Sequence, residues 1–177
     1  MLPATPDTRD RVGVAILARA PVPGRTKTRL IPRLGAEGAA NLHRWLLQRT
    51  VAAAVVADVG PVSLWGTPDT DHPDFALCRA FGDVCLRRQP EGDLGARMLA
   101  ALDEPSGSAG TLVVGTDCPV LTPSILRDAA ARLCGGDDAV VPPHETSLRR
   151  RGPNNAGFLR FLQVSVSWRS CRLRSHG

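Results

Sequence analysis

The sequence of 177 residues lacks several features that would place it in a special class of proteins. No apolar run approaches the roughly 18 residues that a membrane-spanning helix needs. The first residues, 1–11, are polar and contain no apolar segment of a secretory signal, so we expect a cytoplasmic protein. The five cysteines are odd in number and none lies in C-x-x-C spacing, which argues against a disulfide framework or a zinc site.

Lysine is scarce as well, because Lys27 is the only lysine against 21 arginines. The formal net charge is +5, and a basic balance of this kind usually suggests a nucleic-acid partner. The distribution argues against that partner. Residues 1–145 hold 15 basic and 17 acidic side chains, while residues 146–177 hold seven arginines and no acidic residue. Aromatic residues, which stack on single-stranded nucleic acid, make up only 4% of the chain, so we do not expect nucleic-acid binding.

The chain does contain an alternation of short apolar runs and amphipathic segments. The runs predict five strands, over residues 12–17, 62–65, 83–87, 111–114 and 138–141. Helices are expected over residues 36–57, 74–81, 93–102 and 122–133, and a loop over residues 18–35. This order predicts right-handed βαβ units and an α/β fold with a largely parallel, doubly wound sheet. Ligands of such sheets bind beyond the carboxyl ends of the strands.

A first motif gathers cationic residues in the loop after the first strand. Residues 19–29 read Arg-Ala-Pro-Val-Pro-Gly-Arg-Thr-Lys-Thr-Arg. Gly24 lets the backbone approach a ligand, and cationic side chains with exposed N–H groups suit a polyphosphate. The motif is not a Walker A loop, because glycine does not directly precede the lysine. A solvated basic loop is the alternative, and the spacing alone does not decide between them. The cations of the motif are Arg19, Arg25, Lys27 and Arg29.

A second motif lies between the third strand and the following helix. Residues 89–97 read Gln-Pro-Glu-Gly-Asp-Leu-Gly-Ala-Arg. Gly92 suits a backbone that passes close to a flat ligand, and Asp93 can accept a hydrogen bond from a base or a ribose. The plainer interpretation is a turn followed by an aspartate that caps the helix, and the motif taken alone favours it.

The third motif, Gly-Thr-Asp-Cys-Pro over residues 115–119, follows the fourth strand. A buried aspartate at the end of an apolar strand suits a divalent metal that bridges to phosphate oxygens, which makes Asp117 a candidate metal ligand. The alternative is a cap of the following turn, and the position at a strand end favours the functional interpretation. Cys118, Trp45 and Trp65 are expected to pack in the core, and His43 to be an ordinary helix residue.

Together the three motifs resemble a bacterial family, the radical-SAM/selenodomain-associated transferases of type 1. The family is glycosyltransferase-A-like and belongs to the nucleotide-diphospho-sugar transferase superfamily. The resemblance covers about residues 11–145, with the motifs in the same order and spacing. It implies a Rossmann-like, three-layer αβα fold with a mostly parallel sheet. It also implies a glycosyltransferase-type transferase that uses a nucleotide-activated donor, or a nucleotidyltransferase that releases pyrophosphate from a nucleoside triphosphate.

The same resemblance implies roles for individual residues. Lys27 and Asp117 would be the catalytic pair, and Asp117 stands where the superfamily uses an aspartate to hold Mg²⁺ or Mn²⁺ against the diphosphate. Arg19 stands where the family more often has lysine. The phosphates would be held by Arg19, Gly24, Arg25, Lys27 and Arg29. The nucleoside pocket would be lined by Gln89, Gly92 and Asp93.

The resemblance stops at Thr146, after which the acidic Asp-Gly-Gly-Tyr loop of the family is absent, as is any tyrosine. We therefore expect a transferase-like domain over residues 1–145 and an atypical, poorly ordered arginine-rich tail over residues 146–177. A shifted reading frame or a truncated gene would explain this tail. The second carboxylate on the metal side would then be missing, which leaves a non-catalytic nucleotide-binding remnant as a third interpretation.

Overall fold

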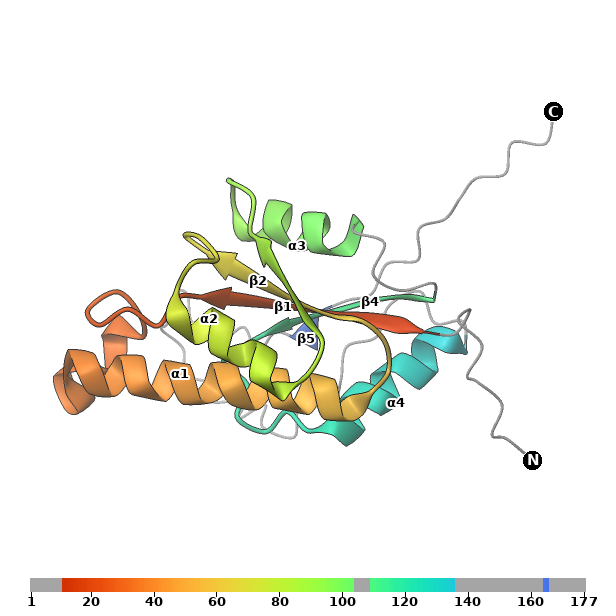
Figure 1. The fold of residues 1–177 in the computed structure, drawn as a ribbon, viewed down its shortest axis with the longest axis horizontal. Coiled ribbons are helices and arrows are strands. Elements are labelled where there is room, and N and C mark those ends of the chain that lie inside the picture. The colour runs from red at the N-terminus through yellow and green to blue at the C-terminus, as the bar shows by residue number, and fades with distance from the viewer. Residues whose placement is uncertain (1–10, 104–108, 136–163, 166–177) are drawn as a thin grey trace, which may run out of the picture.

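The computed structural model describes residues 11–103, 109–135 and 164–165. The described part has one sheet with helices on both faces, in the order β3-β2-β1-β4-β5 (Figure 1). The first four strands are parallel, and β5 runs antiparallel to β4. The strands are β1 (Val12–Arg19), β2 (Val62–Thr67), β3 (Val84–Arg88), β4 (Gly110–Gly115) and β5 (Val164–Ser165).

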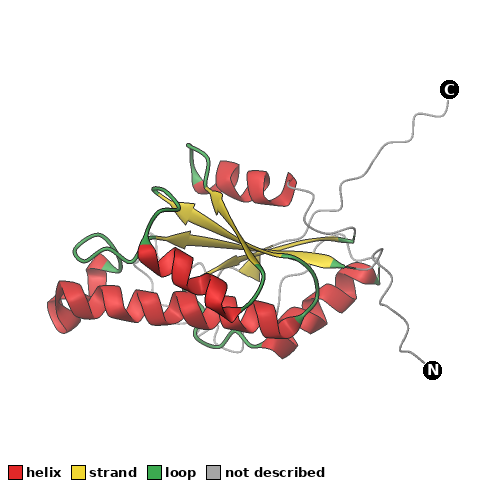
Figure 2. Ribbon diagram, in the orientation of Figure 1, coloured by secondary structure: helices red, strands yellow, loops and turns green. Residues whose placement is uncertain are grey.

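Helices alternate with the parallel strands, and they form the outer layers. Figure 2 shows α1 and α4 below the sheet and α3 above it, which gives the predicted three-layer αβα arrangement. The α-helices are α1 (Ile31–Ala57), α2 (Pro73–Leu77), α3 (Leu94–Asp103) and α4 (Pro123–Cys134). Two short 3₁₀ helices are η2 (Thr28–Leu30) and η3 (Cys78–Phe81). No described helix is both long enough and apolar enough to cross a membrane.

The α/β fold, four predicted strands and all four predicted helices are confirmed, with shifted ends. The largest shift is at α1, which begins at Ile31 rather than residue 36, because Pro32 suits the first turn of a helix. Gly35 interrupts that helix with φ 70° and ψ 169°, so the predicted start coincides with the kink. The predicted fifth strand, residues 138–141, lies outside the described residues, as does the predicted tail apart from β5.

The central strand β1 is buried on both faces of the sheet. Val14 and Ile16 point into the larger core cluster, which also contains residues of α1 and α4. Ala15 points to the opposite face, where it packs with Trp65 of β2 and with Ala101 of α3. This two-sided burial explains why the strand is a continuous apolar run in the sequence. The expected core position of Trp65 is confirmed by its exposed fraction of 7%.

Helix α1 buries one stripe of residues against the sheet, and Trp45 lies outside that stripe. Its indole is 51% exposed, with the guanidinium of Arg49 5.6 Å from the ring centroid, so the expected core position of Trp45 is wrong. The helical period causes this, because position 45 falls between the buried positions. The buried residues of α1 are Ala39, Ala40, His43, Leu46, Leu47, Thr50, Val51, Ala53, Ala54 and Ala57.

Candidate functional site

A cavity of about 490 Å³ opens at the carboxyl ends of β1 and β4. From β1 the chain adds β2 and β3 on one side of the sheet and then returns to place β4 on the other side of β1, since the order is β3-β2-β1-β4. The switch point of the sheet therefore lies between β1 and β4. Such a switch point is where open parallel sheets bind their ligands. Leu17 and Val113 line the cavity from the two strands, and residues of the loops after both strands line it as well. The first and third motifs therefore meet in one cavity.

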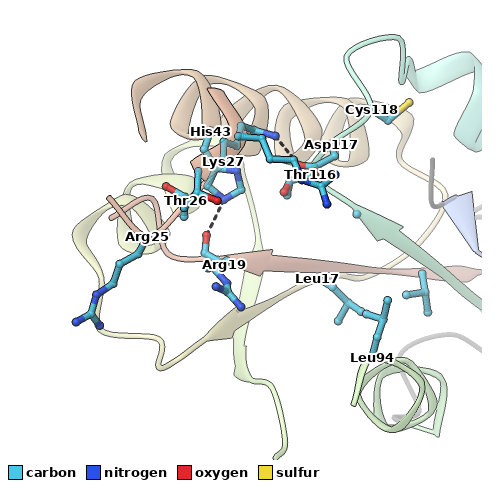
Figure 3. A pocket seen from close by; sticks show the side chains of 14 residues that line it. Leu17, Arg19, Arg25, Thr26, Lys27, His43, Leu94, Thr116, Asp117 and Cys118 are labelled. Carbon is cyan, nitrogen blue, oxygen red and sulfur yellow. Dashed lines mark hydrogen bonds and ion pairs between the residues drawn. The ribbon is translucent and has the colours of Figure 1, made fainter. Parts of the chain in front are cut away.

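The contact that joins the two motifs is an ion pair between Lys27 and Asp117. The ammonium Nζ donates to Asp117 Oδ1 at 2.8 Å, as the dashed line in Figure 3 shows. The lysine side chain is only 15% exposed, whereas the aspartate side chain is 68% exposed. The expectation of a buried aspartate is therefore wrong, because β4 ends at Gly115 and Asp117 lies beyond it in the loop at the cavity.

The loop after β1 presents its cations through a series of tight turns. The Arg25 amide and the Thr26 hydroxyl both donate to the carbonyl of Val22, at 3.0 and 3.1 Å. Gly24 has φ +77°, a left-handed conformation that favours glycine, and is not among the residues that line the cavity. Lys27 is also left-handed, with φ 46° and ψ 42°, at the entry to η2. The predicted cations that line the cavity are Arg19, Arg25, Lys27 and Arg29.

The second motif holds the ends of strands together and caps α3. Gln89 is buried, and its Nε2 donates to the carbonyls of Ala18 and Trp65 at 2.9 and 2.7 Å. Asp93 Oδ1 accepts from the Ala96 amide at 2.8 Å, which confirms the predicted helix cap. Neither of them lines the cavity, and nor does Gly92. The nucleoside-binding role of these three residues stays a prediction.

Residues 50–146 match the family model described as an uncharacterized protein conserved in bacteria, DUF2064. The chain belongs to the DUF2064 family. The matched stretch contains the second and third motifs, and the cationic loop precedes it. No curated protein matches the chain.

Among solved structures, the chain is similar to a candidate nucleotide-diphospho-sugar transferase from Desulfovibrio desulfuricans G20, with a TM-score of 0.60 and 24% identity. That match covers 72% of this chain and 56% of the other. A nucleotidyl transferase from Methanothermobacter thermautotrophicus matches with a TM-score of 0.49 and 22% identity, over 68% of this chain and 57% of the other. The chain thus spans little more than half of either structure. The first likeness shows that this DUF2064 chain shares the α/β fold of the Desulfovibrio structure.

His43 is a site residue that the sequence did not reveal in this DUF2064 chain. Its imidazole lines the cavity and is 5% exposed, and Nε2 lies 2.8 Å from the carbonyl of Arg19. A carbonyl only accepts, so Nε2 carries the proton and fixes the end of β1. Burial lowers the pKa of His43 below its ordinary value of 6.5, which keeps the ring neutral beside the cationic loop. The sequence signal that could have revealed His43 is its position as a polar residue within the otherwise mostly apolar buried stripe of α1.

We expect His43 to make the stability of the protein depend on pH. Its folded pKa is lowered, so the unfolded chain binds the proton more tightly, and stability present above pH 6.5 is lost as the pH falls below that value. His43→Gln supplies an amide N–H donor in place of the imidazole N–H, and this amide does not titrate. Urea unfolding at pH 7.5 and 5.5 should show a smaller loss for the variant, with the difference at most about 1.4 kcal/mol per pH unit. Equal losses in the two proteins would contradict this role.

Proposed function

We propose that the cavity binds the diphosphate of a nucleotide-activated donor and that the protein is a glycosyltransferase-type transferase. The observation that carries the proposal is the meeting of Lys27 and Asp117 in the cavity at the switch point of the sheet. Three arginines line the same cavity, so among the described residues of the lining the cationic groups outnumber the one carboxylate. Guanidinium and ammonium groups form short, charge-assisted hydrogen bonds with phosphate oxygens. A diphosphate would complete the charge balance of this cavity.

The apolar part of the cavity favours a nucleotide over inorganic polyphosphate. Leu17, Val113 and Leu94 line it together with the cations. Figure 3 shows Leu17 and Leu94 close together on the side away from Lys27 and His43. Ligand sites commonly combine an apolar surface with a few polar groups that fix the orientation of the ligand. A nucleotide offers both parts, with a flat base for the apolar side and phosphates for the cations.

The donor atoms of the site fit a divalent metal that arrives with phosphate. Within the described ranges, no three His, Cys, Asp or Glu side chains gather as a ready metal site. Asp117 is the carboxylate among the described residues that line the cavity. Mg²⁺ is usually held by one or two carboxylates together with substrate phosphates, and Asp117 would be the protein ligand in such an arrangement. A bound Mg²⁺ or Mn²⁺ would supply neutralisation of charge on the phosphates.

The chain's own residues would then act by position and charge. Lys27 and the arginines of the loop would bind the diphosphate and stabilise the charge that develops on it as the bond to the sugar breaks. His43, by fixing the carbonyl of Arg19, would hold the start of this loop in place before the donor arrives. A nucleoside triphosphate would engage the same groups with pyrophosphate as the leaving group, so the product identifies the reaction.

A thermal-shift screen of nucleoside diphosphates and their sugars, with Mn²⁺ or Mg²⁺, tests the proposal. A ligand at about 100 times its Kd stabilises the folded state by roughly 2.7 kcal/mol, so a true donor should raise the Tm clearly. Turnover assays then distinguish release of a nucleoside diphosphate from a sugar donor, release of pyrophosphate from a triphosphate, and binding without turnover. No stabilisation by any nucleotide would contradict nucleotide binding.

Asp117→Asn is expected to remove the part of nucleotide binding that depends on metal. The amide keeps the size of the side chain but loses the charge that a hard divalent cation requires. Titration calorimetry of a nucleoside diphosphate should give the variant the same affinity in Mg²⁺ as in EDTA. The unaltered protein should bind the nucleotide more tightly in Mg²⁺ than in EDTA. Asp128→Asn, which removes an exposed carboxylate from α4, is the matched control and should keep the metal effect. A metal effect that survives in Asp117→Asn would assign the metal to other ligands.

A further inference from the structure

Lys27 and Asp117 neutralise each other in the absence of ligand, although the proposed function needs both for other partners. The pair is close, with 2.8 Å between Nζ and Oδ1, and the lysine side chain is largely shielded from solvent. A divalent cation at Asp117 would sit within a few ångströms of an ammonium of the same sign of charge. A diphosphate at Lys27 would meet the same ammonium already paired with a carboxylate. Each ligand therefore competes with the ion pair for one of its members.

The backbone of Lys27 is held in an uncommon conformation. Lys27 holds a left-handed conformation, which is uncommon for a residue with a Cβ and persists only where the surrounding structure enforces it. Its carbonyl accepts from the Leu30 amide at 2.8 Å, which closes the 3₁₀ turn directly after it. The ammonium lies 2.8 Å from Asp117 Oδ1, and the flexible four-carbon stem of a lysine would let it turn to another anion in the same cavity.

Among the described residues that line the cavity, none offers Lys27 a second carboxylate. Asp117 is the acidic side chain of this described lining, among Arg19, Arg25, Arg29 and a neutral His43. If Lys27 leaves Asp117 without an anionic ligand, the ammonium stays among cations and the carboxylate loses its partner. A diphosphate removes that penalty, because it gives Lys27 a new anion and brings oxygen ligands for the metal. The ion pair is therefore stable only until both ligands are present.

We propose that Lys27 holds Asp117 until the donor binds and thereby competes with the metal for this carboxylate, so that the metal and the diphosphate bind cooperatively. This inference rests on the proposed function. The diphosphate draws the ammonium away from Asp117, and the carboxylate becomes available to the cation that accompanies the phosphates. Because coupling between two ligands is reciprocal, the metal must favour the diphosphate as much as the diphosphate favours the metal. The protein would not hold a metal firmly in the absence of the donor.

If Lys27 competes with the metal for Asp117, removing one member of the pair should raise the affinity of the other member for its ligand. Lys27→Met frees Asp117, so Mn²⁺ alone should bind at least threefold more tightly than to the unaltered protein. Free Mn²⁺ measured by electron paramagnetic resonance reports this binding without any turnover. Lys27→Arg keeps a cation at the same position and should bind Mn²⁺ like the unaltered protein. Arg25→Met removes a cation from the same cavity and should tighten Mn²⁺ binding less than Lys27→Met does.

The second half of the test uses the other member of the pair. Asp117→Asn frees Lys27, so a nucleoside diphosphate in EDTA should bind the variant at least threefold more tightly than the unaltered protein. Asp128→Asn makes the same change of charge on α4 and should not tighten that binding. This arm stays informative if Lys27→Met fails to fold. If neither Mn²⁺ binding to Lys27→Met nor nucleotide binding to Asp117→Asn becomes tighter, while the unaltered protein binds the nucleotide, the competition between Lys27 and the metal is overturned. No nucleotide binding by the unaltered protein would instead overturn the proposed function.

Discussion

Replacing Lys27 by alanine is expected to weaken the binding of a nucleoside diphosphate at least tenfold in the presence of Mg²⁺. The ammonium would make a charge-assisted contact with the phosphates in a cavity where its side chain is only 15% exposed. A tenfold change in affinity corresponds to about 1.4 kcal/mol, a modest value for such a contact. Alanine retains a Cβ, so the left-handed backbone costs the variant about as much as it costs lysine. The expected change thus reports the lost ammonium.

Titration calorimetry with the nucleotide identified by the thermal-shift screen measures this effect. Arg33→Ala removes an equal charge from the exposed first turns of α1, outside the cavity lining, and should leave the affinity nearly unchanged. We expect little change in the free energy of unfolding for Lys27→Ala, because Asp117 is largely exposed and such ion pairs contribute little. An unchanged affinity in Lys27→Ala would remove the phosphate-binding assignment of the loop.

The sequence predicted β1, β2 and β4 well because each is a short apolar run that is buried on both faces of the sheet, whereas only Val84 of β3 is fully buried. It also predicted that loops after the strands would meet, since parallel strands end at the same edge. The meeting of Lys27 and Asp117, which are 90 residues apart, follows from that topology. The pairing of their charged atoms does not follow, because it depends on side-chain conformations that the order of the strands leaves open.

Hydrogen bonds from side chains to backbone carbonyls could not be predicted from the sequence. His43 contacts the carbonyl of Arg19, and every residue has such an acceptor, so no residue type marks the partner. Trp45 was misplaced because aromatic residues usually pack inside, whereas the helical period leaves this one facing outward. Gln89 is a second case of such a hydrogen bond, because its amide nitrogen donates to the carbonyls of Ala18 and Trp65, which no residue type marks, while its nucleoside contact stays a prediction.

Gln89→Leu is expected to lower the free energy of unfolding by about 2–6 kcal/mol, because two carbonyls of the strands lose a donor and each costs roughly 1–3 kcal/mol. Those carbonyls belong to Ala18 at the end of β1 and Trp65 in β2, and the Gln89 side chain that joins them is buried. Leucine has a similar volume, so the loss would come from hydrogen bonds rather than from a cavity.

Urea unfolding measures that loss, and Gln48→Leu is the matched control. Gln48 lies half-buried in α1, and the described part of the chain shows no hydrogen bond from its amide, so this change should cost little. Nucleotide affinity, measured where both variants are folded, then separates two roles of Gln89. A large loss of stability with a small loss of affinity assigns it to holding β1 beside β2. A large loss of affinity at normal stability would assign it to the nucleoside instead. Because Ala18 immediately precedes Arg19, we expect the first result: Gln89 fixes the strand from which the cationic loop departs.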